Sequence, residues 1–208
     1  MLAAPSPAFK PPLALPGMRI GLLGGSFNPA HAGHRHISLH AMARAGLNRV
    51  WWVVTPGNPL KSHSELAALD MRLRLADAVA DHRRIDVTGF EVGLGSSFTA
   101  QTLAYLNIRF REVRFVWLMG ADNLAQFHQW KNWRRIVATL PLIVIDRPGW
   151  RYRALASPAG TFIAPYRVAA EDVLGLATMM SPAWAYLDIP LSPISSTAIR
   201  HQDPEIIE

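Results

Sequence analysis

The sequence predicts an α/β protein with a Rossmann-like, doubly wound parallel sheet, helices on both faces, and a short helical segment near the C-terminus. Near-continuous apolar runs, such as residues 50–54 and 115–119, are typical of strands buried on both faces. Segments with apolar residues at helical spacing alternate with these runs, as in parallel sheets connected by helices. Half of the 208 residues are hydrophobic, which is enough for a sizeable core.

The expected elements follow one another at short intervals along the chain. We expect strands at residues 18–23, 50–54, 85–88, 115–119, 142–145 and 186–189. We expect helices at residues 33–45, 66–80, 99–107 and 124–138, the last as one or two helices, and a short helix after residues 193–197. Gly46 is the expected end of the first helix. Residues 150–183 carry no pattern that assigns an element.

The N-terminal segment differs in composition from the rest of the chain. Residues 1–17 are rich in Ala, Pro and Leu, and their five prolines exclude a continuous apolar helix. The segment lacks the early positive charge and unbroken apolar run of a signal peptide, and no run reaches the ~18 apolar residues of a membrane helix. We therefore expect a flexible arm at residues 1–17, a single domain at residues 18–208, Met18 as a candidate start, and no membrane partner.

The composition limits the possible partners. The formal net charge is +6, from 21 Lys and Arg against 15 Asp and Glu, which suits anionic small molecules and nucleic acids alike. No Lys/Arg run or interleaving of basic and aromatic residues supports a nucleic-acid binder, so we expect none. The chain has no cysteine, which excludes disulfides and thiolate catalysis and fits a cytoplasmic protein. No pattern indicates the oligomeric state.

The most informative stretch is residues 21–34, where an apolar strand leads through a glycine-rich turn into a helix. Glycines let the backbone approach an anion, and the helix start supplies free N–H groups and a positive dipole end. His31 and His34 lie three residues apart at that start, so both imidazoles can face a bound phosphate. Without an HExxH frame or further ligands, we expect no protein-bound metal. The predicted anion-binding residues in this stretch are Gly24, Gly25, Ser26, Phe27, His31 and His34.

Polar residues follow the other predicted strands, at the edge where parallel sheets bind ligands. Ser196 and Thr197 open a helix and Arg200 follows within about one turn, so hydroxyls, amides and a guanidinium can form a second anion cradle. Capping is the alternative role for these hydroxyls. Trp130 can stack on a flat ring or belong to the core. The other candidates at the strand exits are Lys61, Gly120, Asp122, Arg147 and Ser195.

Two motifs carry a resemblance to nucleotidyltransferases with a Rossmann-like core. Residues 24–34 resemble their G-G-x-F-D-P-x-H-x-G-H signature, and residues 195–200 resemble their S-S-T-x-I-R signature. Three further pieces resemble one branch, the bacterial nicotinate-nucleotide adenylyltransferases. Residues 97–103 are similar to its S-Y-T-x-x-T-L, residues 120–130 to its G-x-D…W, and residues 144–148 to its strand-end R-P.

The chain departs from these patterns at two positions. Asn28 stands where the family has Asp, and Phe98 stands where it has Tyr. Asparagine keeps the turn-forming capacity of aspartate, so we expect Asn28 to have a structural role. Phe98 keeps the ring and loses the hydroxyl. Neither change argues against nucleotide transfer.

The resemblance implies adenylyl transfer from ATP to nicotinate mononucleotide, with deamido-NAD and pyrophosphate as products. A phosphate monoester is largely ionised near neutral pH, so positioning and charge stabilisation can suffice without a strong base. Mg²⁺ would accompany the nucleotide, held mainly by phosphate and water.

The resemblance also implies a role for each site residue. Asp122 would hold the ATP ribose, and Trp130 would stack on the pyridine ring with Thr99 near it. The residues implied to contact or steady phosphates are His31, His34, Lys61, Arg147, Ser196, Thr197 and Arg200.

Other functions stay open at this point. The acceptor could instead be nicotinamide mononucleotide or pantetheine phosphate, because the sequence does not distinguish a carboxylate from an amide on the pyridine ring. A nucleotide-binding regulator without turnover is a second alternative, against which the intact His31, His34 and Arg200 argue.

Overall fold

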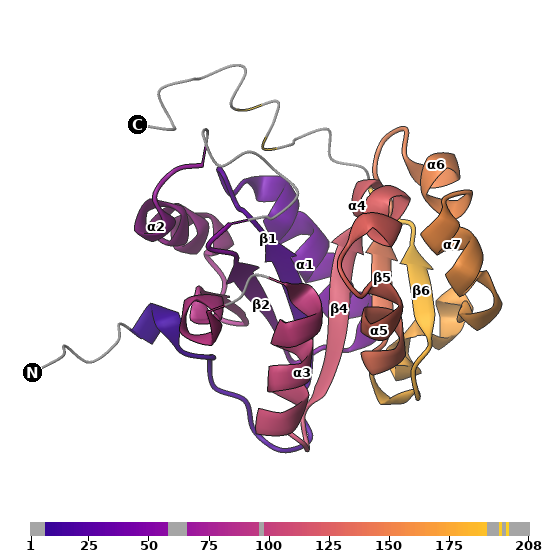
Figure 1. Cartoon of the computed structure of the whole chain (residues 1–208), viewed down its shortest axis with the longest axis horizontal. Coiled ribbons are helices and arrows are strands. Elements are labelled where there is room, and N and C mark those ends of the chain that lie inside the picture. Colours follow the sequence, from indigo (N-terminus) through magenta and orange to yellow (C-terminus); the bar gives the residue numbers. More distant parts are fainter. Residues whose placement is uncertain (1–6, 58–65, 96–97, 191–195, 197–198, 200–208) are drawn as a thin grey trace, which may run out of the picture.

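Six parallel strands form one sheet in the order β3-β2-β1-β4-β5-β6 (Figure 1). The structure is a computed structural model that describes residues 7–57, 66–95, 98–190, 196 and 199. The strands are β1 (Arg19–Gly25), β2 (Arg49–Val54), β3 (Ile85–Thr88), β4 (Arg114–Gly120), β5 (Leu142–Ile145) and β6 (Trp184–Leu187). Because β1 pairs with both β2 and β4, the strand order reverses beside β1, where such sheets open a crevice for ligands. The predicted fold class is confirmed.

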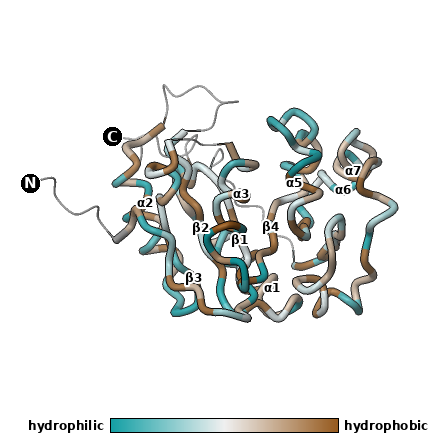
Figure 2. Tube along the Cα trace, turned by 60° about the horizontal axis from the view of Figure 1, so that its bottom comes forward, coloured by the Kyte–Doolittle hydropathy of each residue, from teal (hydrophilic) through white to brown (hydrophobic). Residues whose placement is uncertain are grey.

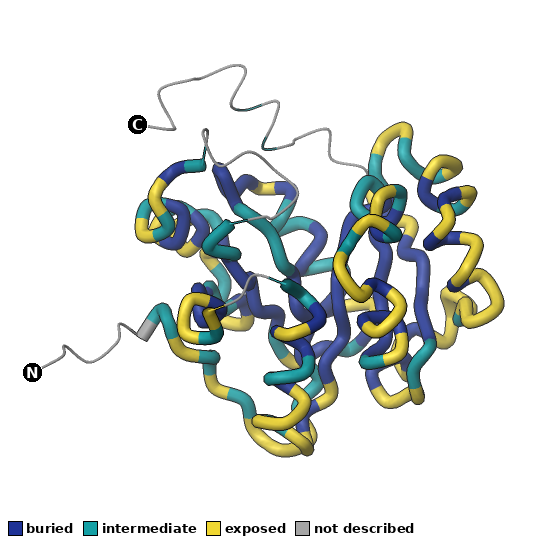
Figure 3. Tube along the Cα trace, viewed as in Figure 1, coloured by how far each residue is buried: buried dark blue, intermediate teal, exposed yellow. Residues whose placement is uncertain are grey.

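Helices cover both faces of the sheet, and each face has its own hydrophobic core. The elements that pack on one face are α1 (Ala32–Ala45), α2 (Leu69–Ala80) and the 3-10 helix η5 (Ala170–Thr178). Those on the other face are η2 (Phe90–Leu94), α3 (Thr99–Arg109), α4 (Ala121–Gln126), η3 (Phe127–Gln129), α5 (Trp133–Thr139), α6 (Arg151–Leu155) and α7 (Pro158–Ile163). The strands between them are largely hydrophobic and buried (Figures 2 and 3). No helix in the described ranges is long and apolar enough to cross a membrane.

Several predicted boundaries were wrong. The second helix begins at Leu69 rather than residue 66, because the Ala67 amide donates to the Asn28 side chain and the Ala67 carbonyl accepts from the Arg72 side chain. The helical region expected at 124–138 begins at Ala121, directly after β4. Its division into more than one helix was one of the two expected forms, and the last of them, α5, follows Asn132, whose φ of 58° is left-handed. The last strand lies two residues earlier than predicted, because Trp184 is buried and pairs with Leu142.

The unassigned region forms mainly short helices. Residues 150–183 contain α6, α7, η5 and the 3-10 helix η4 (Ala164–Tyr166). Ser157 caps α7 by accepting a hydrogen bond from the Gly160 amide at 3.0 Å. None of these helices in the described chain exceeds nine residues, which explains why no helical periodicity is legible.

The N-terminal segment also differs from the expected flexible arm in its described part, residues 7–17. It contains η1 (Pro7–Phe9) and packs beside β3 and η2. The carbonyl of Ala8 accepts a hydrogen bond from the Gly89 amide at 2.7 Å, and that of Lys10 accepts one from the Thr88 hydroxyl at 2.9 Å. The prolines prevent a long continuous helix here and leave backbone carbonyls available, to which the buried Thr88 hydroxyl donates.

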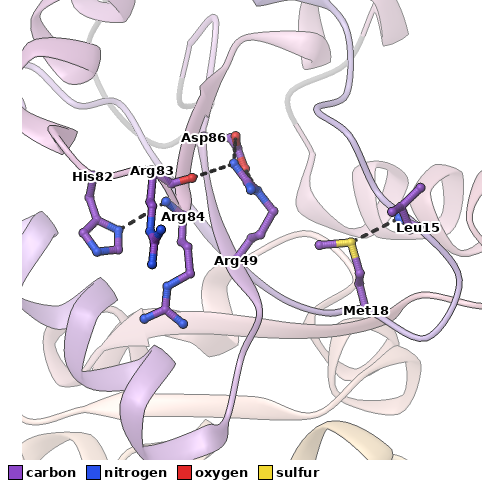
Figure 4. Close-up of polar contacts among 7 residues, drawn as sticks. All are labelled: Leu15, Met18, Arg49, His82, Arg83, Arg84 and Asp86. Carbon is purple, nitrogen blue, oxygen red and sulfur yellow. Dashed lines mark hydrogen bonds and ion pairs between the residues drawn. The ribbon is translucent and has the colours of Figure 1, made fainter.

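The amino ends of the strands are joined by structural polar contacts (Figure 4). Arg49 at the start of β2 donates to both carboxylate oxygens of Asp86 on β3, at 2.5 and 2.6 Å, and to the Arg83 carbonyl at 2.9 Å. This bidentate ion pair therefore aligns the neighbouring strands β2 and β3. The chemistry-bearing residues gather at the opposite, carboxyl edge.

Candidate active site

The turn between β1 and α1 forms the floor of the site at the carboxyl edge of the sheet. A Cβ atom on Gly24 would lie 2.4 Å from the Trp117 ring on β4, so only glycine lets β1 pass this close to the indole. Phe27 has a φ of 47°, a conformation unusual for a bulky residue. Its buried ring is held between Trp52, at 5.1 Å between centroids, and His34, at 4.7 Å.

The two histidines fix each other through the backbone at the start of α1. The Nδ1 atom of His31 accepts a hydrogen bond from the Gly33 amide at 3.1 Å, and Nδ1 of His34 accepts one from the His31 amide at 3.2 Å. This is a capping box in which histidines take the usual Ser and Glu positions. Because each Nδ1 is an acceptor, each neutral ring carries its proton on Nε2. The ring centroids are 3.9 Å apart, so two Nε2–H donors are held as a pair.

The environment keeps both imidazoles neutral. Burial lowers the pKa of His31 to about 4, with a further contribution from the positive charge of Arg147. Burial, His31 and Arg147 lower the pKa of His34 well below its ordinary value. A pair of neutral donors near a cation can bind phosphate oxygens at neutral pH without needing to gain a proton.

A buried network holds Arg147 at the end of β5. Asp146 accepts hydrogen bonds from the Arg147 amide at 2.8 Å and from the Tyr186 hydroxyl at 2.6 Å, and it also pairs with Arg151. The Arg147 side chain lies 3.4 Å, Nε to Oδ1, from Asp122 at the start of α4. The exits of β4, β5 and β6 are thereby connected, and the charge of Arg147 acts on both histidines.

Arg72 on α2 organises the neighbouring loops, and the sequence reasoning missed it. The residue is 1 % exposed, and its guanidinium donates to the carbonyls of Ser26, Thr55 and Ala67 at 2.8 Å and to that of Pro56 at 3.3 Å. Burial lowers its pKa, so the cation depends on these carbonyl dipoles. The available signal was a charged residue on the apolar helical stripe of Leu69, Leu73 and Ala76.

Asn28 and Ser196 complete the turn. The Oδ1 atom of Asn28 accepts a hydrogen bond from the Ala67 amide at 3.2 Å, which supports the structural role expected for this buried residue. The Ser196 hydroxyl donates to the Pro29 carbonyl at 2.9 Å, so the C-terminal motif reaches the turn before α1. The other predicted residues of that motif and the second-strand loop lie outside the described residues: Lys61, Ser195, Thr197 and Arg200.

Trp130, the residue implied to stack on the pyridine ring, is connected to the same turn through Trp117. Trp130 is half-buried and meets Trp117 edge-on at 6.3 Å between centroids, and Trp117 in turn covers Gly24. A Cβ on Gly120 would lie 2.3 Å from the Asp122 carboxylate, so a larger residue there would displace this side chain. Thr99 is the first residue of α3. Between α1 and the exits of β5 and β6 lies a small cavity lined by Gly33, Ile37, Arg147, Ile189 and neighbouring residues.

The free energy of unfolding should depend on pH through the protonation of His31. An unfolded chain protonates His31 near its ordinary pKa of about 6.5, whereas the folded chain does so only at about 4. Between these values the unfolded state binds more protons, so stability rises with pH and is lost as pH falls from about 6.5 to about 4. We expect His31→Asn, which keeps a capping oxygen, to lose less stability over this range. Urea unfolding across the range tests this, and parallel curves for both proteins would contradict it.

Taken together, a parallel sheet that ends in paired neutral imidazoles and an arginine defines a site for a polyanionic ligand of the nucleotidyltransferase type. In agreement, residues 22–202 match the cytidylyltransferase-like family model. A relative from Ruegeria pomeroyi, named "Probable nicotinate-nucleotide adenylyltransferase", is 52% identical over 91% of this chain and 88% of its own length. One of the same name from Methylorubrum extorquens is 53% identical over 88% of this chain and 99% of its own. The chain belongs to the nicotinate-nucleotide adenylyltransferase family.

The fold is also found in a solved structure. Plasmodium falciparum nicotinic acid mononucleotide adenylyltransferase, complexed with NaAD, matches with a TM-score of 0.66 over 88% of this chain and 83% of that one. At 18% identity this likeness shows the fold alone.

Proposed function

We propose that this protein transfers the adenylyl group of ATP to nicotinate mononucleotide, forming deamido-NAD and pyrophosphate in NAD biosynthesis. The observation that carries the proposal is the pair of neutral Nε2–H donors of His31 and His34, with the Arg147 charge beside them. The family membership supports the choice of acceptor. A cytoplasmic location is part of the same proposal.

The reaction needs placement more than proton transfer. A phosphate oxygen of the mononucleotide attacks the α-phosphorus of ATP, the bond from that phosphorus to the bridging oxygen breaks, and pyrophosphate leaves in line. Negative charge grows on the leaving phosphates, where preorganised donors are most effective. In this proposal His31 and His34 donate to the ATP phosphates, Asp122 holds the ribose, and Arg147 steadies a phosphate.

The acceptor is proposed to lie against Trp130, with Thr99 near its ring. In support, Trp130 has a half-buried indole that meets Trp117 edge-on, and Trp117 lies against Gly24 of the glycine turn. Lys61, Ser195, Ser196, Thr197 and Arg200 keep their proposed contacts with nucleotide phosphates.

Mg²⁺ is proposed to enter with ATP. Among the described residues no group of three or more His, Asp or Glu is arranged to hold a metal ion, and Asp122 already faces Arg147. These residues fit an ion held by phosphate oxygens and water, which would neutralise the charge of the pyrophosphate.

The proposal is tested by pyrophosphate release from ATP with nicotinate mononucleotide, nicotinamide mononucleotide or pantetheine phosphate as acceptor. We expect the highest kcat/KM with nicotinate mononucleotide, deamido-NAD as the product, and loss of turnover when a chelator removes divalent cations. A clear preference for another acceptor would overturn the substrate, and no release above background with any acceptor would favour a non-catalytic nucleotide binder.

A further inference from the structure

The two pyridine mononucleotides differ by one charge and almost nothing in shape. Nicotinate carries a ring carboxylate, whereas nicotinamide carries a neutral amide of similar size. A stacking ring such as Trp130 cannot tell them apart, because both present the same π face. Discrimination therefore depends on the groups placed around the ring substituent, and a cationic group there favours the carboxylate over the neutral amide.

Lys131 is such a group. It directly follows Trp130, and its Nζ lies 4.3 Å from the ring centroid of Phe98, the residue directly before Thr99. The ammonium thus extends from the segment that carries the stacking indole to the segment that begins α3. No carboxylate within the described ranges pairs with it.

The contact between the Lys131 ammonium and the Phe98 ring is weak enough for a substrate carboxylate to replace it. An exposed cation over an aromatic face contributes about 0.5–1 kcal/mol, and Lys131 is exposed. Phe98 lacks the hydroxyl of the Tyr in the resembling motif, so it offers the ammonium only a ring face. A neighbouring cation, Arg134, lies over a different ring, with its Cζ 4.7 Å from the Trp133 ring centroid.

We propose that Lys131 pairs with the ring carboxylate of nicotinate mononucleotide and so sets the preference for the acid over the amide. This inference rests on the proposed function, because it takes Trp130 and Thr99 as the pyridine site. In this proposal Lys131 contacts the ring substituent of the substrate and takes no part in phosphoryl chemistry. Removing its charge should therefore raise the KM for nicotinate mononucleotide and leave the KM for nicotinamide mononucleotide unchanged.

The experiment compares kcat/KM for both mononucleotides in the wild type, Lys131→Met, Lys131→Arg and Arg134→Met. Methionine keeps the length of the stem and removes the charge, arginine keeps the charge, and Arg134→Met removes a neighbouring cation outside the site. We expect Lys131→Met to lower the acid-to-amide ratio of kcat/KM about tenfold, through a higher KM for nicotinate mononucleotide. Lys131→Arg should retain most of the ratio, and Arg134→Met should leave it unchanged.

The failures can be distinguished. A wild type inactive with nicotinate mononucleotide overturns the proposed function and this inference together. A wild type that prefers the acid while Lys131→Met keeps the same ratio overturns only this inference. An equal loss with both acceptors would show that Lys131 supports the fold of the segment, which also overturns it.

Discussion

His34→Ala should lower kcat by about a hundredfold to a thousandfold, the usual effect of removing one preorganised donor to a developing oxyanion. The reason is local. The Nδ1 atom of His34 is already used by the His31 amide, so the ring position and the direction of its Nε2–H are fixed before substrate arrives. Alanine removes the donor, and no other side chain on α1 occupies that position.

The measurement is steady-state pyrophosphate release, with far-UV circular dichroism to confirm that the fold persists. His40→Ala is the matched control, because His40 lies on the same helix and its recorded ring contact is with His36, not the anion site. We expect the control to retain wild-type turnover. Activity of His34→Ala within a few-fold of wild type would show that the phosphate site has been assigned to the wrong residues.

Arg72→Met should have the largest effect on stability. The side chain joins the turn after β1, the loop after β2 and the residues before α2, through four carbonyls. Methionine leaves these buried acceptors without their donors, at a cost of about 3–5 kcal/mol in the free energy of unfolding, comparable to breaking a buried ion pair. Because the Ser26 carbonyl belongs to the anion-binding turn, KM for ATP should rise as well.

Urea unfolding measures the first effect and ATP titration of the initial rate measures the second. Arg74→Met is the control, since Arg74 is exposed on the same helix and donates a hydrogen bond to the Met71 sulfur rather than to loop carbonyls. It should change stability by less than about 0.5 kcal/mol. Arg72→Lys should fall between them, because one ammonium cannot reach carbonyls on three segments. An unchanged unfolding midpoint for Arg72→Met would refute the role of this residue.

Much of the fold was predictable because local patterns decide it. The strands β2, β3, β4 and β5 were placed within one residue at either end, since each is an apolar run of high strand propensity bounded by turn residues. The end of α1 at Gly46 followed from glycine's tolerance of the left-handed conformation, which it adopts with a φ of 58°. The short helices of residues 150–183 and the packing of residues 7–17 were not predictable, because neither has a periodic pattern.

The candidate site likewise has some features that the sequence determined and others that only the tertiary structure decided. Sequence alone determined that His31 and His34 stand at a helix start after a glycine turn, since spacing in one segment fixes that. Only the tertiary structure decided that both rings keep a proton on Nε2 and that burial, with a smaller contribution from Arg147, lowers their pKa values. It also decided that Asp146 and Tyr186 hold Arg147 in place. Only it showed that Arg72 joins three loops. These features depend on contacts between residues far apart in the chain and on burial, and local spacing contains neither.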